Sequence, residues 1–369
     1  MQQRCVSNMA YLSSVGTSIP EHNLSQEEVK QLITEIFPAS ERKINRLLSV
    51  FDHALIENRQ FVVEPDWYKK EHSFKERNDL YQQLAKKHMV EAVMNCLTDQ
   101  HAYTADISPS EVDMIIFVSS TGISTPSMEV ELFNDLPFRE DIYRMPLWGL
   151  GCAGGAIGLS RAFDWLRAHP EKTALVICLE LCSLTFQKHD IKKSNIVGTA
   201  LFGDGSAAAL AVGEKSPLLK RVKRKMPRII TTDSRTKKHS QDVMGWNVSN
   251  TGLEVIFAKS IPQLVESFWK EHIYSFLHKT SLAEKHIHSF IAHPGGKKVL
   301  EAMEDVLETK KSKLSSSYEI LRKHGNMSSA TVLYVLGDML RRKVDENEIS
   351  ILSALGPGFS SELLLMEWK

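Results

Sequence analysis

The chain contains an internal repeat, and this repeat restricts the possible folds more than any other feature of the sequence. Residues 151–156, Gly-Cys-Ala-Gly-Gly-Ala, resemble residues 325–330, Gly-Asn-Met-Ser-Ser-Ala, at an offset of 174 positions (326 − 152). Residues 117–122 fall on 291–296 at the same offset, and the apolar run that begins at 174 falls on the run at 348–352. Chance similarity between short Gly/Ser strings is the alternative. Because the period is far too long for a solenoid, the sequence predicts two similar halves that pack together.

Strand patterns and helix patterns alternate along most of the chain. Continuous apolar runs, typical of strands buried on both faces of a sheet, lie at 112–118, 174–179, 207–212, 287–292, 349–352 and 363–366. Helical patterns lie at 25–36, where Ser25 is the expected N-cap, and at 76–97, 153–168, 261–277, 297–307 and 328–341. This alternation predicts an α/β fold. We divide the chain into an N-terminal half, residues 1–225, and a C-terminal half, residues 226–369.

The composition is that of an ordinary globular protein, with 43% hydrophobic residues in a chain of 369. Forty-five Lys and Arg residues balance forty-five Asp and Glu residues, so we expect no nucleic-acid partner, and the basic run 220–225 is expected to be a solvated face. Residues 1–16 lack the apolar segment of a signal peptide, and no later stretch reaches the roughly 18 apolar residues of a membrane span. We therefore expect a cytoplasmic protein.

The five cysteines, Cys5, Cys96, Cys152, Cys178 and Cys182, are scattered along the chain. None has the Cys-x-x-Cys or Cys/His spacing of a zinc site, and the odd number of thiols favours the reduced state. The chain also lacks the phosphate-binding loop Gly-x-x-x-x-Gly-Lys-Ser/Thr and the Gly-x-Gly-x-x-Gly pattern of dinucleotide-binding folds. We therefore predict neither a metal ion nor a bound cofactor.

Cys152 is the candidate nucleophile. It separates the run 147–151 from the small residues 153–156, a pattern typical of a strand-to-helix turn with the thiol at its tip. A helix N-terminus carries free backbone N–H groups and partial positive charge, which stabilise a thiolate and lower its pKa. Most free cysteines are instead small buried apolar residues, and Cys178, within an apolar run, fits that description better.

His293 and Asn326 are the candidate partners of this thiol. His293 ends an apolar run and precedes Pro294-Gly295-Gly296, so its backbone leaves the sheet at a fixed point. An imidazole there could pair with a thiolate and later donate a hydrogen bond to an oxyanion. The simplest role of Asn326 is that of an N-cap. The repeat, however, places it opposite Cys152, where its amide could donate to an enolate or carbonyl oxygen.

Five separated motifs together resemble one family. These motifs are Gly151-Cys152, Phe202-Gly203-Asp204-Gly205, His293-Pro294-Gly295-Gly296, residues 325–330 and Gly356-Pro357-Gly358. In this order they resemble the chalcone synthase-like type III polyketide synthases, and most closely their bacterial alkylpyrone-synthase branch. The resemblance implies a thiolase-like α/β fold in which two duplicated βαβαβαββ halves form α-β-α-β-α layers.

The same resemblance implies an acyltransferase that acts as a homodimer on coenzyme A thioesters. Cys152, His293 and Asn326 match the family's catalytic triad, and Phe202 matches a gatekeeping aromatic between the coenzyme A tunnel and the reaction cavity. The implied activity is iterative decarboxylative condensation of malonyl-CoA onto an acyl-CoA starter, expected to be fatty acyl. The implied products are triketide or tetraketide alkylpyrones or alkylresorcinols.

The substrate-binding positions depart from the plant members of that family. The further candidates are Val255, Cys182, Thr185, Ser328, Gly356, Gly358 and Arg59, the two glycines through backbone amides near a thioester oxygen. Val255 stands where plant enzymes carry a second gatekeeping phenylalanine, which implies a wider cavity mouth. Cys182 replaces a cavity threonine, whereas Thr185 keeps the next one. Glu57 takes a position that plant enzymes use for a basic side chain on the coenzyme A phosphates, so Arg59 is the candidate for that contact.

Two other functions fit the same residues. A ketoacyl-carrier-protein synthase of the initiating type uses the same triad and stops after one condensation. The segment 119–126 and the chain length favour the polyketide branch instead. A non-catalytic binding protein on the same fold is the second alternative, but a scaffold has no need of a thiol at a helix tip.

Overall fold

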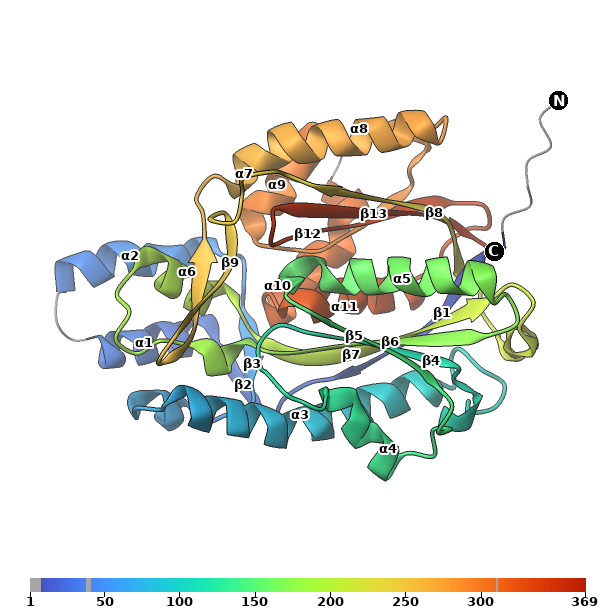
Figure 1. The fold of residues 1–369 in the computed structure, drawn as a ribbon. Coiled ribbons are helices and arrows are strands. Elements are labelled where there is room, and N and C mark those ends of the chain that lie inside the picture. The colour runs from blue at the N-terminus through green and yellow to red at the C-terminus, as the bar shows by residue number, and fades with distance from the viewer. Residues whose placement is uncertain (1–7, 38–40, 310) are drawn as a thin grey trace.

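The computed structural model describes residues 8–37, 41–309 and 311–369, and its elements form α-β-α-β-α layers (Figure 1). Helix α3 (Phe74–Leu97) covers one outer face, and α8 (Lys270–Lys279) and α9 (Lys297–Val306) cover the other. Helices α5 (Gly154–Ala168) and α11 (Thr331–Leu340) lie between the two layers of strands. This is the predicted thiolase-like arrangement.

The strands of the two halves follow the same spatial order. In the N-terminal half the order is β5 (Tyr143–Trp148), β4 (Met114–Ser119), β6 (Thr173–Leu181), β7 (Asp204–Gly213) and β1 (Ala10–Ser18). In the C-terminal half it is β11 (Ser289–Ala292), β12 (Ile349–Gly356), β13 (Ser360–Trp368) and β8 (Pro227–Thr236). Within the described residues, the second half therefore repeats the first without a counterpart of β5. Short pairing between β1 and β8 joins both into one sheet of nine strands.

Side-chain alternation along the strands divides the core into three clusters. In β4, Ile115 and Phe117 pack with α3 residues in the first cluster, whereas Ile116 and Val118 pack with α5 and α11 in the second. The third cluster lies between β12, β13 and the helices α8 and α9. Strands buried on both faces explain why their sequences are continuous apolar runs.

A group of elements beside these layers carries most of the residues that later line the cavities. This group, at the left of Figure 1, contains α1 (Gln26–Ile36), α2 (Glu41–His53), α6 (Lys193–Leu201), β2 (His22–Ser25), β3 (Asn58–Phe61) and the hairpin of β9 (Met244–Ser249) and β10 (Gly252–Phe257). The remaining helices are α4 (Leu132–Asp135), α7 (Ile261–Leu264) and α10 (Ser315–His324). The predicted N-cap of α1 is confirmed, since Ser25 and Glu28 form a capping box.

The sequence analysis located the buried elements better than the polar ones. Every predicted strand and helix is present, although the pattern 261–277 divides into α7, a π-helical segment at 265–269 and α8. The elements that were missed are strands β1, β2, β3, β5, β8, β9 and β10 and helices α2, α4, α6 and α10. In β1, buried Ser13 and Ser14 interrupt the apolar pattern because both hydroxyls bond to the phenol of Tyr103. The boundary after residue 225 stays a prediction, since the two halves share one sheet.

Three structural findings bear on the predictions from composition. Cys96, Cys152, Cys178 and Cys182 are free thiols, and Cys5 lies outside the described residues. Among residues 8–37, 41–309 and 311–369, no group of three His, Cys, Asp or Glu side chains could hold a metal ion. In the same residues, no helix has the length and hydrophobicity needed to cross a membrane.

The packing of α5 against the start of α11 requires glycine at position 155. A Cβ atom at Gly155 would lie 2.3 Å from the carbonyl oxygen of Ser329, whereas one at Gly295 would meet atoms no closer than 3.7 Å. We predict that Gly155→Ala lowers the free energy of unfolding by about 1–3 kcal/mol, because the added methyl overpacks a rigid contact. Gly295→Ala is the control and should change it less. Urea denaturation compares the two variants, and equal stability would contradict this packing argument.

Candidate active site

Cys152 lies at the turn that connects β5 to α5. The turn Gly151–Ala153 is a 3-10 segment that leads into α5, and the side chain of Cys152 is buried. Gly149 and Gly151 have positive φ values of 83° and 47°, which a residue with a Cβ atom adopts only at a cost. The Gly151 N–H donates to Ser120 Oγ at 3.0 Å. The thiol thus has the predicted place at the start of a helix.

Asn326 meets this thiol from the other half of the chain. Its Nδ2 lies 3.8 Å and its Oδ1 3.9 Å from Cys152 Sγ. Oδ1 accepts a hydrogen bond from the Ser328 N–H at 2.8 Å, which leaves Nδ2 as the donor available to the sulfur or to a substrate. Asn326 is not the N-cap of the following helical segment, because that segment begins at Ser328 and its N-cap is Met327.

The electrostatics of Cys152 differ from the expectation for a helix N-terminus. Burial raises the pKa of the thiol to about 12, and the negative charge of Glu180 acts in the same direction. Hydrogen bonds with the side chains of Ser328 and Asn326 lower the pKa but do not offset burial. The predicted lowering of this pKa is therefore wrong for the buried thiol, which keeps its proton near neutral pH.

His293 is buried where β11 ends, and its ring is unpartnered. Its backbone N–H donates to the Ser353 carbonyl at 2.8 Å, which fixes the chain at the end of the strand. Neither Nδ1 nor Nε2 has a hydrogen-bond partner among the described residues. Burial lowers the pKa of the imidazole to about 3, so it is neutral. Cys152 and Asn326 are thus in contact, whereas His293 makes no hydrogen bond to either in this state.

Glu180 is a buried carboxylate beside the thiol that sequence reasoning missed. It accepts hydrogen bonds from the Ser120 N–H (3.0 Å), Thr121 Oγ1 (2.9 Å) and Ser329 Oγ (2.6 Å), so it links the two halves. Burial raises its pKa to about 7. An acidic residue inside the apolar run of β6 was the signal in the sequence that could have identified it.

Four of the predicted substrate-binding residues line one apolar cavity. Cys182, Thr185, Phe202 and Val255 surround it together with residues of α1. The α1 residues are Val29, Leu32, Ile33 and Ile36. The backbone on both sides of Phe202 is bonded to Asn326. The Gly203 N–H donates to the Asn326 carbonyl, and the Asn326 N–H donates to the Leu201 carbonyl.

Arg59 is fully buried and bonded to protein groups, which disfavours the predicted contact with coenzyme A phosphates. The residue is fully buried, and its guanidinium donates to the carbonyls of Thr199 and Phe202 and to Gln26 Oε1. Burial lowers its pKa to about 9, yet it stays charged near neutral pH. Arg59 therefore caps the C-terminal end of α6 and fixes the backbone of Phe202.

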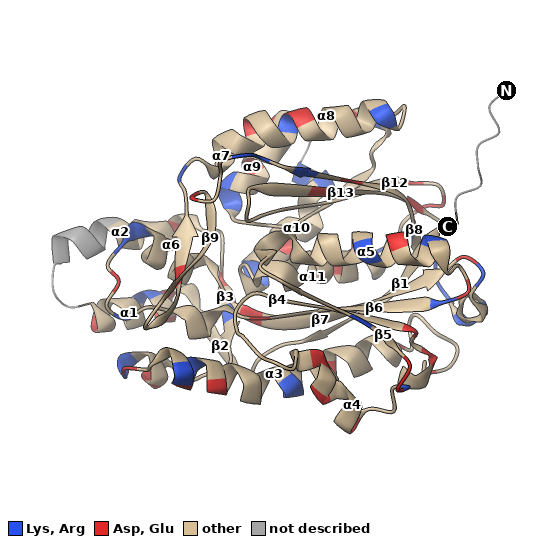
Figure 2. Cartoon of the chain, in the orientation of Figure 1, with Lys and Arg blue, Asp and Glu red and all other residues tan. Residues whose placement is uncertain are grey.

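Four lysines from segments that are far apart in the sequence form a cationic surface in a second cavity, which Arg59 does not line. This cavity, of about 500 Å³, adjoins Leu201 and Gly295. Its charged lining consists of Lys193, Lys259, Lys297 and Lys298. Figure 2 shows blue segments on α9 and beside α7, where this cavity lies. Sequence reasoning missed these lysines because only the fold brings them together.

The two candidate glycines at the end of β12 and in the turn after it differ in their surroundings. A Cβ atom at Gly356 would lie 2.6 Å from Ala153 Cβ and 2.7 Å from the Leu150 carbonyl oxygen, so β12 packs directly on the Cys152 turn. Gly358 has φ +114° in the turn between β12 and β13, with no close contact of this kind. A role of either amide near the thioester stays a prediction.

Comparison with known proteins agrees with this architecture over nearly the whole chain. The family model for the N-terminal domain of chalcone and stilbene synthases matches residues 1–216, and that for the C-terminal domain matches residues 231–368. A Bacillus subtilis (strain 168) protein, whose name assigns it provisionally as a chalcone synthase, is 48% identical over 362 residues, which are 98% of this chain and 99% of that protein.

Two further proteins show similarity at lower identity. The 1,3,6,8-tetrahydroxynaphthalene synthase of Streptomyces peucetius subsp. caesius is 33% identical over 360 residues, 97% of this chain and 93% of that enzyme. The crystal structure of 1,3,6,8-tetrahydroxynaphthalene synthase from Streptomyces coelicolor A3(2), a bacterial type III polyketide synthase, has a TM-score of 0.88 at 26% identity and covers 97% of this chain and 99% of that chain.

These similarities favour the polyketide synthase interpretation over the carrier-protein synthase and the scaffold. The enzymes of this family are acyltransferases that use coenzyme A thioesters and condense malonyl-CoA. The chain belongs to the chalcone and stilbene synthase family of type III polyketide synthases.

Proposed function

We propose that this enzyme extends a fatty acyl-CoA starter with malonyl-CoA and releases triketide or tetraketide alkylpyrones or alkylresorcinols. The observation that carries the proposal is the contact between Cys152 and Asn326 close to a cavity with an apolar lining. The cavity wall formed by α1 consists of hydrocarbon side chains only, namely Val29, Leu32, Ile33 and Ile36. Such a wall favours an alkyl chain over a small polar starter.

In the proposed first step, the acyl group of the starter moves to Cys152. The sulfur attacks the thioester carbonyl carbon and its proton passes to the neutral imidazole of His293, which acts as the general base. The bond between the carbonyl carbon and the coenzyme A sulfur breaks, and coenzyme A leaves as the thiol after it takes up that proton. The step starts from a neutral thiol on Cys152 and a neutral imidazole on His293, the protonation states that burial favours.

In the second step, malonyl-CoA loses carbon dioxide and becomes an enolate. Asn326 Nδ2 and His293 donate hydrogen bonds to the thioester oxygen on which the negative charge develops. The enolate carbon then attacks the acyl carbonyl, and the Cys152 sulfur leaves. Ring closure through an enol oxygen gives a pyrone, and closure through carbon gives a resorcinol-type ring.

The lysines of the second cavity support coenzyme A recognition. Lys193, Lys259, Lys297 and Lys298 can neutralise phosphate groups of the thioester without any role for Arg59. We propose that the pantetheine arm passes Leu201 from this cavity to reach Cys152. The proposed reaction thus needs coenzyme A thioesters as substrates and no bound cofactor. The cytoplasmic location of the protein stays a prediction.

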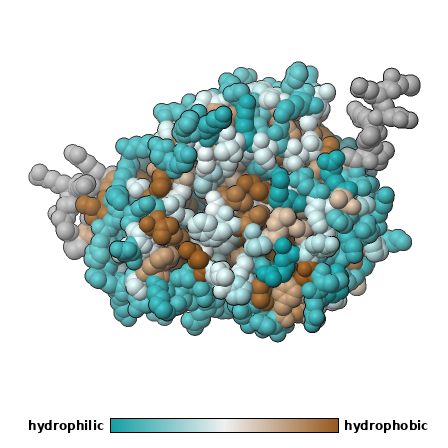
Figure 3. Space-filling view, viewed as in Figure 1, coloured by the Kyte–Doolittle hydropathy of each residue, from teal (hydrophilic) through white to brown (hydrophobic). Residues whose placement is uncertain are grey.

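The edge strand β5 supports a homodimer. Its only paired neighbour among the described residues is β4, so its outer edge presents free backbone groups. Tyr143 and Trp148 on this strand are 59% and 54% exposed. Figure 3 shows hydrophobic surface, in brown, around the middle of the face on which β5 lies in Figure 1. We propose that a second copy of the chain covers this edge, because one exposed edge can pair with itself about a two-fold axis.

Asn326→Ala tests the role of the carboxamide. We expect decarboxylation of malonyl-CoA to fall by about a hundred- to a thousandfold, because one oxyanion donor is lost. Acylation of Cys152 by the starter should be affected far less. Carbon dioxide release measures the first step, and intact-protein mass spectrometry the second. Asn247→Ala, on the β9–β10 hairpin, is the matched control. Normal decarboxylation by Asn326→Ala would show that the carboxamide does not stabilise the enolate.

A series of acyl-CoA starters from two to sixteen carbons tests the substrate class. We expect kcat/KM to rise with chain length before it levels off, since each buried methylene contributes about 0.8 kcal/mol. Mass spectrometry of the products gives the starter, the number of extensions and the ring type. Polyketides formed from malonyl-CoA alone, at a rate that starters do not raise, would contradict the acyl starter and favour the product class of the naphthalene synthases.

Substitution of lysine for the exposed aromatic residues of β5 tests the proposed dimer interface. We expect the double variant Tyr143→Lys/Trp148→Lys to change the mass in solution from twice 41.7 kDa to 41.7 kDa, because a two-fold interface would place like charges opposite each other. Multi-angle light scattering measures the mass. Val248→Lys adds a charge at an equally exposed apolar residue of β9 and should leave the dimer intact. A wild-type protein that is monomeric would refute the proposed interface.

A further inference from the structure

The apolar cavity is too small in this state for the chain that the proposed function places in it. Its volume is about 40 Å³. Ligand-binding pockets in proteins typically measure roughly 300–1,000 Å³, so a fatty acyl chain requires one wall to move outward. The wall that moves, and the groups that hold it, then determine how long a starter the enzyme accepts.

The β9–β10 hairpin is a more exposed wall of the cavity than α1. It forms a separate two-stranded sheet, and most of its residues are partly or fully exposed. Val255 extends from β10 into the cavity beside Gly198 and Phe202. The opposite wall, on α1, includes Val29 and Ile33, which are at most 1% exposed and belong to the first core cluster. Segments with few buried contacts open at the lowest free energy.

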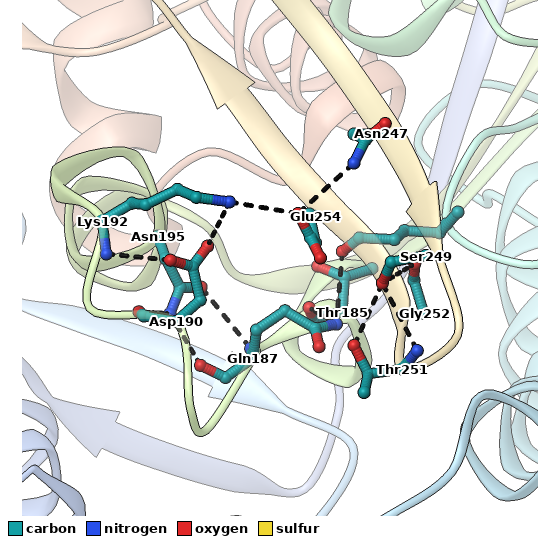
Figure 4. A network of polar contacts seen from close by, with 11 residues as sticks. Thr185, Gln187, Asp190, Lys192, Asn195, Asn247, Ser249, Thr251, Gly252 and Glu254 are labelled. Carbon is teal, nitrogen blue, oxygen red and sulfur yellow. Dashed lines mark hydrogen bonds and ion pairs between the residues drawn. The ribbon is translucent and has the colours of Figure 1, made fainter.

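A buried amide ties this hairpin to the rest of the cavity wall. Gln187 Nε2 donates to the Thr185 carbonyl at 3.0 Å and to the Leu253 carbonyl on β10 at 3.5 Å. Gln187 is 5% exposed, and its own backbone is fixed by Asn195, whose Nδ2 donates to the Gln187 carbonyl at 2.8 Å. Figure 4 shows the side chain of Gln187 extending toward Thr185 and the hairpin strand that carries Gly252.

An ion pair makes a second link on the outer side of the same wall. Lys192 Nζ lies 3.3 Å from Glu254 Oε2, which also accepts from Asn247 Nδ2 at 3.4 Å (Figure 4). The Lys192 side chain is 67% exposed, and exposed pairs of this kind contribute little to stability. Gln187 and Glu254 both line an outer cleft of about 370 Å³ beside the hairpin.

We propose that Gln187 is a positioning residue that sets the accepted starter length by holding β10 against the cavity. This inference rests on the proposed function, since it concerns the acyl chain bound there. Opening the wall breaks the weaker of the two Gln187 hydrogen bonds, that to Leu253, and leaves the one to Thr185. Short starters fit with little movement of the hairpin, whereas long starters require it. Removing the Gln187 hydrogen bond to Leu253 therefore lowers the free energy needed to move the hairpin, which affects long starters and not short ones.

Gln187→Leu tests the proposal, because leucine keeps a similar size without hydrogen-bond donors. We expect the ratio of kcat/KM for hexadecanoyl-CoA to that for hexanoyl-CoA to rise by about fivefold, the factor of one net hydrogen bond. Malonyl-CoA decarboxylation without a starter should stay within about twofold of wild type, which a general loss of structure would not allow. Lys192→Ala is the matched control on the exposed link and should leave the ratio unchanged.

Hydrogen exchange of the backbone amides at 252–257 provides a readout that does not depend on activity. We expect these amides to exchange about fivefold faster in Gln187→Leu than in the wild-type protein or in Lys192→Ala. Unchanged exchange, or faster exchange with an unchanged length ratio, would overturn the proposal, and Gln187→Ala serves the same comparison if leucine misfolds. A wild-type enzyme that extends no acyl-CoA would overturn the proposed function and this inference with it.

Discussion

The close approach of the Cys152 turn to residues 325–330 is the constraint on which the rest of the site depends. Gly155 lets α5 lie against the backbone of Ser329, where a Cβ atom would be only 2.3 Å from the carbonyl oxygen. The same packing holds Asn326 Nδ2 3.8 Å from Cys152 Sγ. These groups belong to different halves of the duplicated fold, so neither half contains the site alone. Duplication provides two equivalent helix starts, and the central layer brings them face to face.

Burial in this layer determines the protonation states on which the chemistry depends. The thiol of Cys152 and the imidazole of His293 are both held neutral, with pKa values of about 12 and about 3. A site that disfavours charge does not favour a permanent thiolate, but it strengthens each hydrogen bond donated to a developing oxyanion. Decarboxylation suits such a site because loss of carbon dioxide generates the carbanion without a strong base. Glu180, with a pKa of about 7, becomes charged as the pH rises and opposes ionisation of the thiol.

The sequence predicts the parts of this structure in which burial and sequence pattern coincide. Strands β4, β6 and β7 are buried on both faces, so their apolar runs identify them, and the internal repeat pairs Cys152 with Asn326. Arg59 is a residue whose role the sequence does not reveal. It lies near the positions at which related plant enzymes bind the coenzyme A phosphates, but its guanidinium caps the end of α6. The cavity lysines come from segments as distant as 193 and 298, so only the fold reveals them. The protonated state of Cys152 depends on how deeply the thiol is buried, and the residues next to it in the sequence do not indicate this.

In the proposed function, catalysis and selection of the starter depend on different parts of the structure. Cys152 and Asn326 lie where the central helices begin, beside Glu180 of β6, in a region where nearly every side chain is buried and a displacement would disturb packing on two sides. Val255 lies on a hairpin outside the layers, whose polar links to the rest of the cavity wall include one buried amide and one exposed ion pair. A rigid site needs fixed distances, whereas a pocket for chains of different lengths needs a wall with more than one position. Changes in the hairpin can therefore alter which starter is used while the geometry of condensation stays the same.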